Sequence, residues 1–336
     1  MPHGWIILDK PHGLGSTQAV AAVKRVCRQS GLGKVKVGHG GTLDPLATGV
    51  LPIALGEATK LTGRMLDGDK VYAFTVAFGA ETDTLDLEGQ VIGVSDVRPT
   101  LAEVEAVLPR FTGSIEQVPP AYSAIMVDGT RAYDLARKGE AVELKGRAVT
   151  VHEILPLWGR WRAESVTEGA GPAQCPPFVS PAGLPPPPEG EDLLEQITLT
   201  AHVSKGTYIR SLARDIALAL GTRGHVTMLR RLKAGPFAIE QAISLDKLEE
   251  VAKGAPLENV LLPLEAGLVD IPALTLSPEQ ARAVRQGRVL AGLSPDDGFV
   301  DGLYWAKAGT VPVALLEVSS GEAKVVRGFN LPDVAE

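Results

Sequence analysis

Alternating apolar positions predict β-strands in two separate segments of the chain. In residues 71–78 every second side chain is large and apolar, and an apolar period of two returns in residues 196–203. Because successive side chains of a strand point to opposite faces, each segment can bury one face. A short apolar run at residues 5–8, which ends before a Lys-Pro turn, predicts a third strand near the N-terminus.

A helical period predicts two helices outside these strands. The first is expected to follow an N-cap at Ser16, and its apolar face contains Val20, Val23 and Cys27. The second is expected in the region just after the strand at 196–203 and to end at a C-capping glycine, Gly221. Both patterns are typical of helices that bury one side and expose the other.

The C-terminal region predicts a small module of its own. Residues 277–280 have the sequence of a capping box, which opens a short helix expected to stop at Gly287. Residues 311–318 and 323–326 are apolar runs on either side of a Ser-Ser-Gly-Glu turn, and this spacing predicts a β-hairpin.

Residues 159–191 interrupt these periodic patterns. The segment is rich in proline, including a run of four at 185–188, and shows neither a helical nor a strand period. Proline removes a backbone donor and fixes the backbone angle φ, so such a segment is a poor candidate for either structure. We therefore expect an inserted, mobile loop here.

One stretch, His39–Pro52, surrounds a single carboxylate, Asp44, with glycines, prolines and apolar residues. A structural interpretation is available, because Asp44 followed by Pro45 is a common helix N-cap with proline at the first position. Gly49 can then close a single turn. Spacing alone favours this structural interpretation over a catalytic one.

The same stretch resembles the catalytic motif of the TruB family of bacterial tRNA pseudouridine-55 synthases. That motif is a Gly-Thr-Leu-Asp-Pro-Leu-Ala-Thr-Gly run with a histidine just upstream, and residues 41–49 match it at every position. Further blocks match in the family's order, and together they cover most of residues 4–240. These blocks are Asp9–Pro11, Gly56–Lys60, Thr82–Asp86, Pro120–Ala124 and Ser204–Asp215.

The resemblance implies a fold and a domain organisation. The expected fold is α+β, with a mixed, largely antiparallel sheet and flanking helices (the pseudouridine synthase fold), followed by a small PUA-like β-domain. The catalytic domain is expected at residues 1–246, with the Pro-rich inserted loop at about 160–193. A linker at 247–270 and a PUA-like RNA-binding domain at 271–336 would complete the chain. The C-terminal match is loose, and a merely stabilising appendage is the alternative.

The resemblance also implies an activity, the isomerisation of uridine 55 in the T loop of tRNA to pseudouridine. One carboxylate suffices to begin this reaction, and the resemblance assigns that role to Asp44. Asp44 can attack C1′, add to C6 of the ring or remove the C2′ proton, and the sequence does not choose among these steps. Arg210 is expected to hold Asp44 ionised, because a guanidinium stabilises a nearby carboxylate. The alternative for Arg210 is a phosphate contact.

The target base must leave its stack before it can react, and the resemblance places four side chains around it. Tyr72 is expected to stack on the base and to take part in catalysis, while an ordinary core aromatic is the alternative. His39 is expected to fill the space that the base leaves. Tyr208 and Leu229 are expected to form the walls of the pocket.

Local charge is compatible with an RNA partner although the formal net charge is −7. Basic residues outnumber acidic ones in residues 1–64 and 205–233, and these segments would form a phosphate-binding face if they meet in space. Solvated helix faces are the alternative. Lys10 and Lys60 are predicted substrate contacts, although Lys60 also fits a simple surface position. Met126 stands where the family usually has lysine, which puts one RNA contact in doubt, and the alternatives for its side chain are packing against a base or against the protein.

Other signals limit the remaining function classes. No apolar run approaches the roughly 18 residues of a membrane span, and no export signal is recognisable, so a cytoplasmic protein is expected. We also expect a monomer. The sequence has no Walker motif, no strand-linked Gly-x-Gly-x-x-Gly, and six histidines without ligand spacing, so we expect no metal, nucleotide or other cofactor. Cys27 and Cys175 are interpreted as structural.

Two competing functions remain open at this stage. A nucleosidase or glycosidase that uses Asp44 would need a second carboxylate as general acid, and the motif offers none. An RNA-binding or tRNA-folding module without turnover would not need Asp44 at all.

Overall fold

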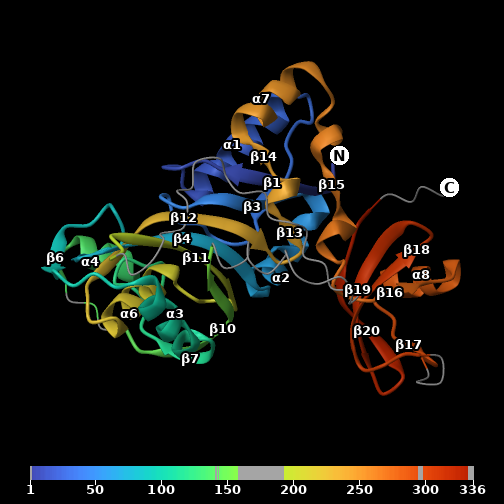
Figure 1. Ribbon diagram of the computed structural model, residues 1–336. Coiled ribbons are helices and arrows are strands. Elements are labelled where there is room, and N and C mark those ends of the chain that lie inside the picture. Colours follow the sequence, from blue (N-terminus) through green and yellow to red (C-terminus); the bar gives the residue numbers. More distant parts are fainter. Residues whose placement is uncertain (1, 141, 143, 158–192, 294–297, 332–336) are drawn as a thin grey trace, which may run out of the picture. The chain divides into compact units, whose positions relative to one another are not determined.

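Two compact units make up the chain, shown as a computed structural model in Figure 1. Unit 1 combines Met1–Gly68 with Arg231–Glu336, and unit 2 is Asp69–Arg230. The predicted inserted loop, except its last residue, and Cys175 lie outside the described residues. The described residues are 2–140, 142, 144–157, 193–293 and 298–331.

Unit 1 is built on strand β1, Gly4–Lys10, whose side chains are almost all buried. This strand confirms the prediction for residues 5–8. β1 pairs antiparallel with β3, Thr48–Leu55, from Gly4 opposite Leu55 to Lys10 opposite Gly49. Of the three shorter strands beside them, β14 runs parallel to β1 and the other two are antiparallel. They are β2 (Val37–His39), β14 (Ile243–Ser244) and β15 (Leu262–Pro263).

Helix α1, Ser16–Gln29, follows β1 and buries Val23 and Cys27 on its apolar face, as predicted. Its N-cap is Gly15, so the prediction that Ser16 caps the helix is wrong. The Ser16 hydroxyl instead donates to the carbonyl of Leu43 at 2.9 Å and accepts from the amide of Leu43 at 2.8 Å. The hydroxyl that a helix cap would use is therefore hydrogen-bonded to Leu43, which is distant in the sequence.

The predicted linker at residues 247–270 is structured. Helix α7, Leu245–Gly254, lies beside α1 in Figure 1, and Glu249 pairs with Arg25 of α1 at 2.6 Å. The helical turns η4 (Leu257–Val260) and η5 (Leu264–Gly267) follow. The indole N–H of Trp5 donates to the carbonyl of Leu264 at 3.1 Å, and both side chains belong to one buried cluster. The connection is therefore part of the core of unit 1.

A five-stranded sheet forms the C-terminal β-domain, in the order β16-β18-β19-β20-β17. Only its β16–β18 pair is parallel. The predicted capping box is confirmed, since the Ser277 hydroxyl accepts from the amide of Gln280 at 3.2 Å and opens α8, Pro278–Arg285, which Gly287 follows. The predicted hairpin is the β19–β20 pair. The strands are β16 (Ala273–Thr275), β17 (Leu290–Ala291), β18 (Gly302–Ala308), β19 (Val311–Ser319) and β20 (Glu322–Gly328).

The buried cluster around Trp5 also contains Leu315 and Phe329 from the C-terminal β-domain. Packing therefore groups this β-domain with the N-terminal strands in unit 1. The domain boundaries expected at residues 246 and 270 stay predictions.

Unit 2 is an antiparallel sheet in the order β4-β11-β10-β7, with helices packed on it. The predicted alternation in β4 and β11 is confirmed, because Phe74, Val76 and Leu199 lie in one core cluster with residues of two helices. Gly221, with φ +73, follows the second of these helices, α6 (Ile209–Ala219), as predicted. The elements are β4 (Lys70–Phe78), β7 (Gly113–Gln117), β10 (Arg147–Pro156), β11 (Gln196–Val203), α3 (Leu101–Val107) and α6 (Ile209–Ala219).

The remaining elements are short, apart from β12, Gly224–Ala234, which contributes residues to both units. In unit 1 they are η1 (Gly56–Leu61), α2 (Thr62–Asp67), β13 (Phe237–Ala238) and η3 (Ile239–Gln241). In unit 2 they are β5 (Ala80–Thr82), β6 (Val91–Val94), η2 (Leu108–Phe111), β8 (Met126–Val127), β9 (Thr130–Arg131) and α4 (Ala132–Arg137). The fold is α+β with a mostly antiparallel sheet, as predicted. Among the described residues, no helix has the length and apolar character that a membrane span requires.

Gly49, at the start of β3, allows a test of how tightly this strand packs. A Cβ atom there would lie 2.2 Å from the carbonyl oxygen of Arg231, and the backbone has φ +99. We expect Gly49→Ala to lower the free energy of unfolding by at least about 2 kcal/mol, measured by urea denaturation. Gly63→Ala is the control, because a Cβ on this exposed helical glycine meets nothing within 4 Å. Equal effects of the two substitutions would contradict the prediction.

Candidate active site

Asp44 lies in the loop between β2 and β3, at residues 40–47. The loop begins where only glycine fits, because a Cβ on Gly40 would lie 2.7 Å from the Cβ of Met65. The carbonyl of Asp44 accepts a hydrogen bond from the amide of Ala47 at 3.1 Å. This bond closes a single turn, but no helix begins at Asp44 and Gly49 lies in β3, so the interpretation of Asp44 as a helix N-cap is wrong. Asp44 is half-buried.

Lys10 is completely buried, and its ammonium group contacts the Asp44 loop. Its Nζ donates to the carbonyls of Pro11 at 3.0 Å, Leu14 at 2.7 Å and Pro45 at 3.1 Å. Three acceptors match the three N–H groups of an ammonium. The side chain thus holds the loop, and its burial argues against the predicted direct contact between Lys10 and a substrate.

Arg231 is a second buried cation at the same loop, and the sequence analysis did not single it out. Its Nε donates to the carbonyl of Val50 at 2.7 Å, and its two Nη atoms donate to Thr42 at 3.1 Å and Gly41 at 3.2 Å. The guanidinium therefore joins the residues just before the carboxylate to strand β3. The sequence signal was only a mixture of basic and apolar residues at 225–233, which does not indicate which arginine is buried.

The buried charges influence each other. Burial lowers the pKa of Lys10 to about 8, the negative charge of Asp44 opposes this shift, and the positive charge of Arg231 adds to it. Burial, and then the charge of Arg231, also lowers the pKa of His39, so this imidazole is neutral at pH 7. Its Nδ1 accepts from the amide of Gly41 at 3.4 Å. Asp44 therefore interacts with a lysine that is cationic below about pH 8.

The aromatic candidates lie in unit 2. Tyr72 and Leu229 are half-buried and pack against its core cluster. Tyr208 is fixed through its backbone, because its amide donates to Oε1 of the buried Gln117 at 2.7 Å and its carbonyl accepts from Nε2 at 3.1 Å. The guanidinium of Arg147 lies 4.9 Å from the centre of the Tyr208 ring. Neither Gln117 nor Arg147 was identified from the sequence.

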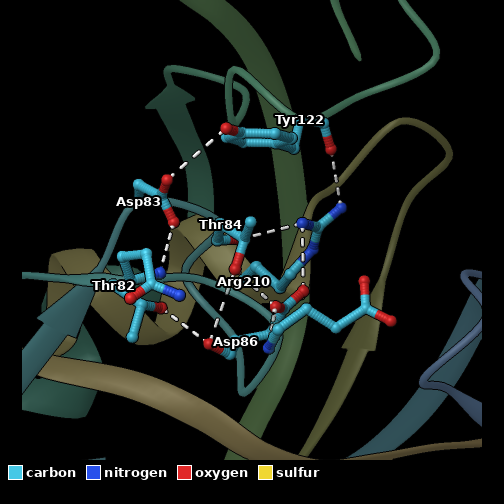
Figure 2. A network of polar contacts seen from close by, with 8 residues as sticks. Thr82, Asp83, Thr84, Asp86, Tyr122 and Arg210 are labelled. Atoms are coloured by element: carbon cyan, nitrogen blue, oxygen red, sulfur yellow. Dashed lines mark hydrogen bonds and ion pairs between the residues drawn. The ribbon is translucent and has the colours of Figure 1, made fainter. Parts of the chain in front are cut away.

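Arg210 lies in the buried polar network of Figure 2. Its Nη1 lies 3.2 Å from Oδ2 of Asp86 and donates to the carbonyl of Thr84 at 2.9 Å. Its Nη2 donates to the carbonyl of Tyr122 at 2.9 Å. Both charged side chains are about nine-tenths buried, so the pair is isolated from bulk water. The guanidinium is thus fixed by one carboxylate and two carbonyls.

The segment Thr82–Asp86 is folded so that it presents Asp86 to this arginine. The Thr84 hydroxyl donates to Oδ1 of Asp86 at 2.5 Å, and the Thr82 hydroxyl donates to the Asp86 carbonyl at 2.7 Å. Leu85 between them has φ +62, which is uncommon for a residue with a side chain. The sequence analysis noted this block as a family match but gave Asp86 no role.

The candidate residues are divided between the two units. Unit 1 holds Asp44 with His39, Lys10 and Lys60, whereas unit 2 holds Arg210 with Tyr72, Tyr208 and Leu229. The described ion pair of Arg210 is the one with Asp86. The pairing of Arg210 with Asp44 stays a prediction.

Two further candidates differ in their surroundings. The Lys60 ammonium lies 2.7 Å from Glu57 and donates to the carbonyl of Gly328 at 2.9 Å, so it joins η1 to the end of β20. Met126 lies in the β8–β9 hairpin with 59% of its surface exposed. Packing against the protein therefore does not explain Met126, and a contact with RNA stays a prediction.

Comparison with protein families gives two matches. The family model "TruB family pseudouridylate synthase (N terminal domain)" matches residues 28–165. The family model "tRNA pseudouridylate synthase B C-terminal domain" matches residues 210–269. Together the two models match more than half of the chain.

Similar proteins match along the whole chain. A tRNA pseudouridine synthase B of Novosphingobium aromaticivorans is 68% identical over 337 residues, which cover 100% of both chains. That of Zymomonas mobilis is 56% identical, over 98% of this chain and 96% of its own. A chain of the solved Cbf5-Nop10-Gar1 complex has a TM-score of 0.66 at 25% identity, and the match covers 98% of this chain and 85% of that one.

The shifted pKa of Lys10 predicts a pH-dependent stability. Between about pH 8 and its ordinary pKa of 10.5, unfolded lysine holds a proton that folded Lys10 has released. Because the unfolded state then binds more protons, stability rises with pH in this window. The stability of the wild type relative to Lys10→Met should therefore increase from about pH 7.5 to about pH 9.5, measured by urea denaturation. Lys34→Met, at an exposed lysine, is the control. A flat difference for Lys10→Met would contradict the prediction.

Proposed function

We propose that the chain, which belongs to the TruB family of pseudouridylate synthases, modifies uridine 55 in the T loop of tRNA and uses Asp44 as its essential carboxylate. The chain is an isomerase that converts a uridine of tRNA to pseudouridine, as its family and its full-length relatives show. The position of the uridine and the roles of single residues belong to the proposal.

The geometry of the Asp44 loop is the main support for this role. The isomerisation breaks the bond from N1 to C1′, turns the uracil over and joins C5 to C1′. Asp44 begins it by attack on C1′, by addition to C6 or by removal of the C2′ proton, and in each case the carboxylate must be ionised. Lys10, which is cationic below about pH 8, interacts with Asp44, and the buried anchors of the loop fix its position.

The proposal assigns the remaining candidates to the target base. The uridine is flipped out of its stack, which costs a few kcal/mol. Tyr72 stacks on the base and takes part in catalysis, and Tyr208 and Leu229 form the walls of its pocket. His39 fills the space that the base leaves in the RNA. The fixed backbone of Tyr208 and its contact with Arg147 support such a rigid wall.

The proposal takes the enzyme as a cytoplasmic monomer that binds the T arm of tRNA and needs no cofactor for the chemistry. The alternatives, a nucleosidase or an RNA-binding module without turnover, gain no support from the family or the relatives.

The test of this function is a modification assay on an unmodified tRNA transcript. Pseudouridine leaves the mass unchanged, so the product is mapped by primer-extension stops after carbodiimide treatment. We expect one stop at position 55 with the wild type and none with Asp44→Asn, which keeps the shape but removes the charge. The affinity of Asp44→Asn for tRNA should stay within about tenfold, because backbone contacts dominate binding.

Asp96→Asn is the matched control, since Asp96 is an exposed carboxylate outside the motif and its loss should leave the stop unchanged. Turnover by Asp44→Asn would end the proposed role of Asp44. Stops at another uridine would refute the assignment to the T loop, although they would still show that the protein forms pseudouridine.

Arg210 provides a second prediction, because its buried network leaves it little freedom to grip a phosphate. We expect Arg210→Met to lower turnover while the slope of log Kd against log salt for tRNA stays unchanged. Arg131→Met, at an exposed arginine beside Met126, should make that slope shallower by about one if the hairpin contacts RNA.

A shallower slope for Arg210→Met would show that Arg210 contacts a phosphate. Because Arg210→Met leaves Asp86 buried without its partner, folding is checked by circular dichroism. Arg210→Lys, which keeps the charge but not the planar fork, serves as the milder variant.

A further inference from the structure

We propose that Asp69, His152 and His202 form a binding site for a divalent transition metal of the zinc type. The three side chains belong to unit 2 and lie outside the groups assigned to the reaction. One carboxylate oxygen and two imidazole nitrogens converge there, and all three lie within 4.8 Å of one another. Two histidines and one carboxylate are a donor set that zinc accepts.

The measured distances fit a tetrahedral site. Nε2 of His152 lies 3.2 Å from Oδ2 of Asp69, and Nε2 of His202 lies 3.7 Å from the same oxygen. Zinc binds histidine nitrogen and carboxylate oxygen at about 2.0–2.2 Å, which makes the edge of a regular tetrahedron about 3.3–3.6 Å. Two of the three donor–donor distances are therefore close to those of ligands around one ion, and the third is within 4.8 Å.

The fold creates this cluster through an irregularity in β10. In the pairing of β10 with β11, Val151 lies opposite Val203, and Glu153 lies opposite the neighbouring residue, His202. His152, between Val151 and Glu153, is therefore the extra residue of a β-bulge. A bulge re-aims a side chain, and here the His152 ring lies 4.6 Å from the His202 ring. The sequence analysis found no ligand spacing because the two histidines are far apart in the chain.

Partial exposure also suits a metal site. The three side chains are between 38% and 46% exposed, so an ion can enter and retain a water as a further ligand. A bound ion would join the residue before β4 to both β10 and β11. It would thus restrain β4, the strand that carries Tyr72, although Tyr72 is not one of the ligands.

A plain ion pair between Asp69 and a protonated histidine is the competing explanation. It would use the same three groups, but it would respond to protons and would not saturate with metal. The two explanations make different predictions for a titration with Zn²⁺ alone.

The experiment is isothermal titration of the full-length protein, freed of metal with EDTA and then of EDTA, with Zn²⁺ at neutral pH. We expect one saturable Zn²⁺ per chain. His152→Ala and Asp69→Asn should each weaken its binding at least about tenfold. His12→Ala removes an exposed histidine elsewhere and should leave the affinity unchanged.

A second readout does not depend on heat signals. Zn²⁺ that binds only the folded state should raise the melting temperature of the wild type with increasing concentration. The rise should be absent in Asp69→Asn, whose own melting temperature without metal shows that it is folded. Absence of saturable binding, or binding that both ligand variants retain, would overturn the proposal. If lower pH stabilises the folded protein but Zn²⁺ does not bind, the ion pair would be favoured and the metal-site proposal would be overturned.

Discussion

The position of Asp44 depends on two buried cations that donate hydrogen bonds to the backbone around it. Residues 40–47 form no regular structure, so their inward-facing carbonyls need donors from elsewhere. Arg231 supplies donors for Gly41 and Thr42, and Lys10 supplies one for Pro45. Charged donors form the stronger hydrogen bonds, which offsets part of the cost of burying both charges. The loop is thereby held on both sides of the carboxylate.

Much of the fold was predictable because the signals are local. The alternation in β4 and β11 and the capping box at Ser277 each depend on residues within a few positions of one another. The prediction for Ser16 failed for the opposite reason, because its hydroxyl bonds to Leu43, which is 27 residues away. Local rules hold wherever no distant partner competes for the same group.

The polar support of the candidate site was not predictable, because each contact joins distant parts of the chain. Arg231 meets Gly41 across 190 positions, and Arg210 meets Asp86 across 124. The spacing of apolar and polar residues along the sequence does not indicate such partners. A sequence pattern can identify a block that resembles a family, as it did for residues 82–86, but it does not say which carboxylate faces which arginine.

The two units balance their buried charges differently. In unit 2, Arg210 forms an ion pair with Asp86, so the charges of these two side chains offset each other. In unit 1, the positive charge of Arg231 lowers the pKa of Lys10, and the negative charge of Asp44 opposes this shift. Both cations donate to backbone carbonyls of the loop, and Lys10 also interacts with Asp44 through its charge. An enzyme with a single essential carboxylate gains from this arrangement, because the hydrogen bonds of the two cations fix the loop that carries the carboxylate.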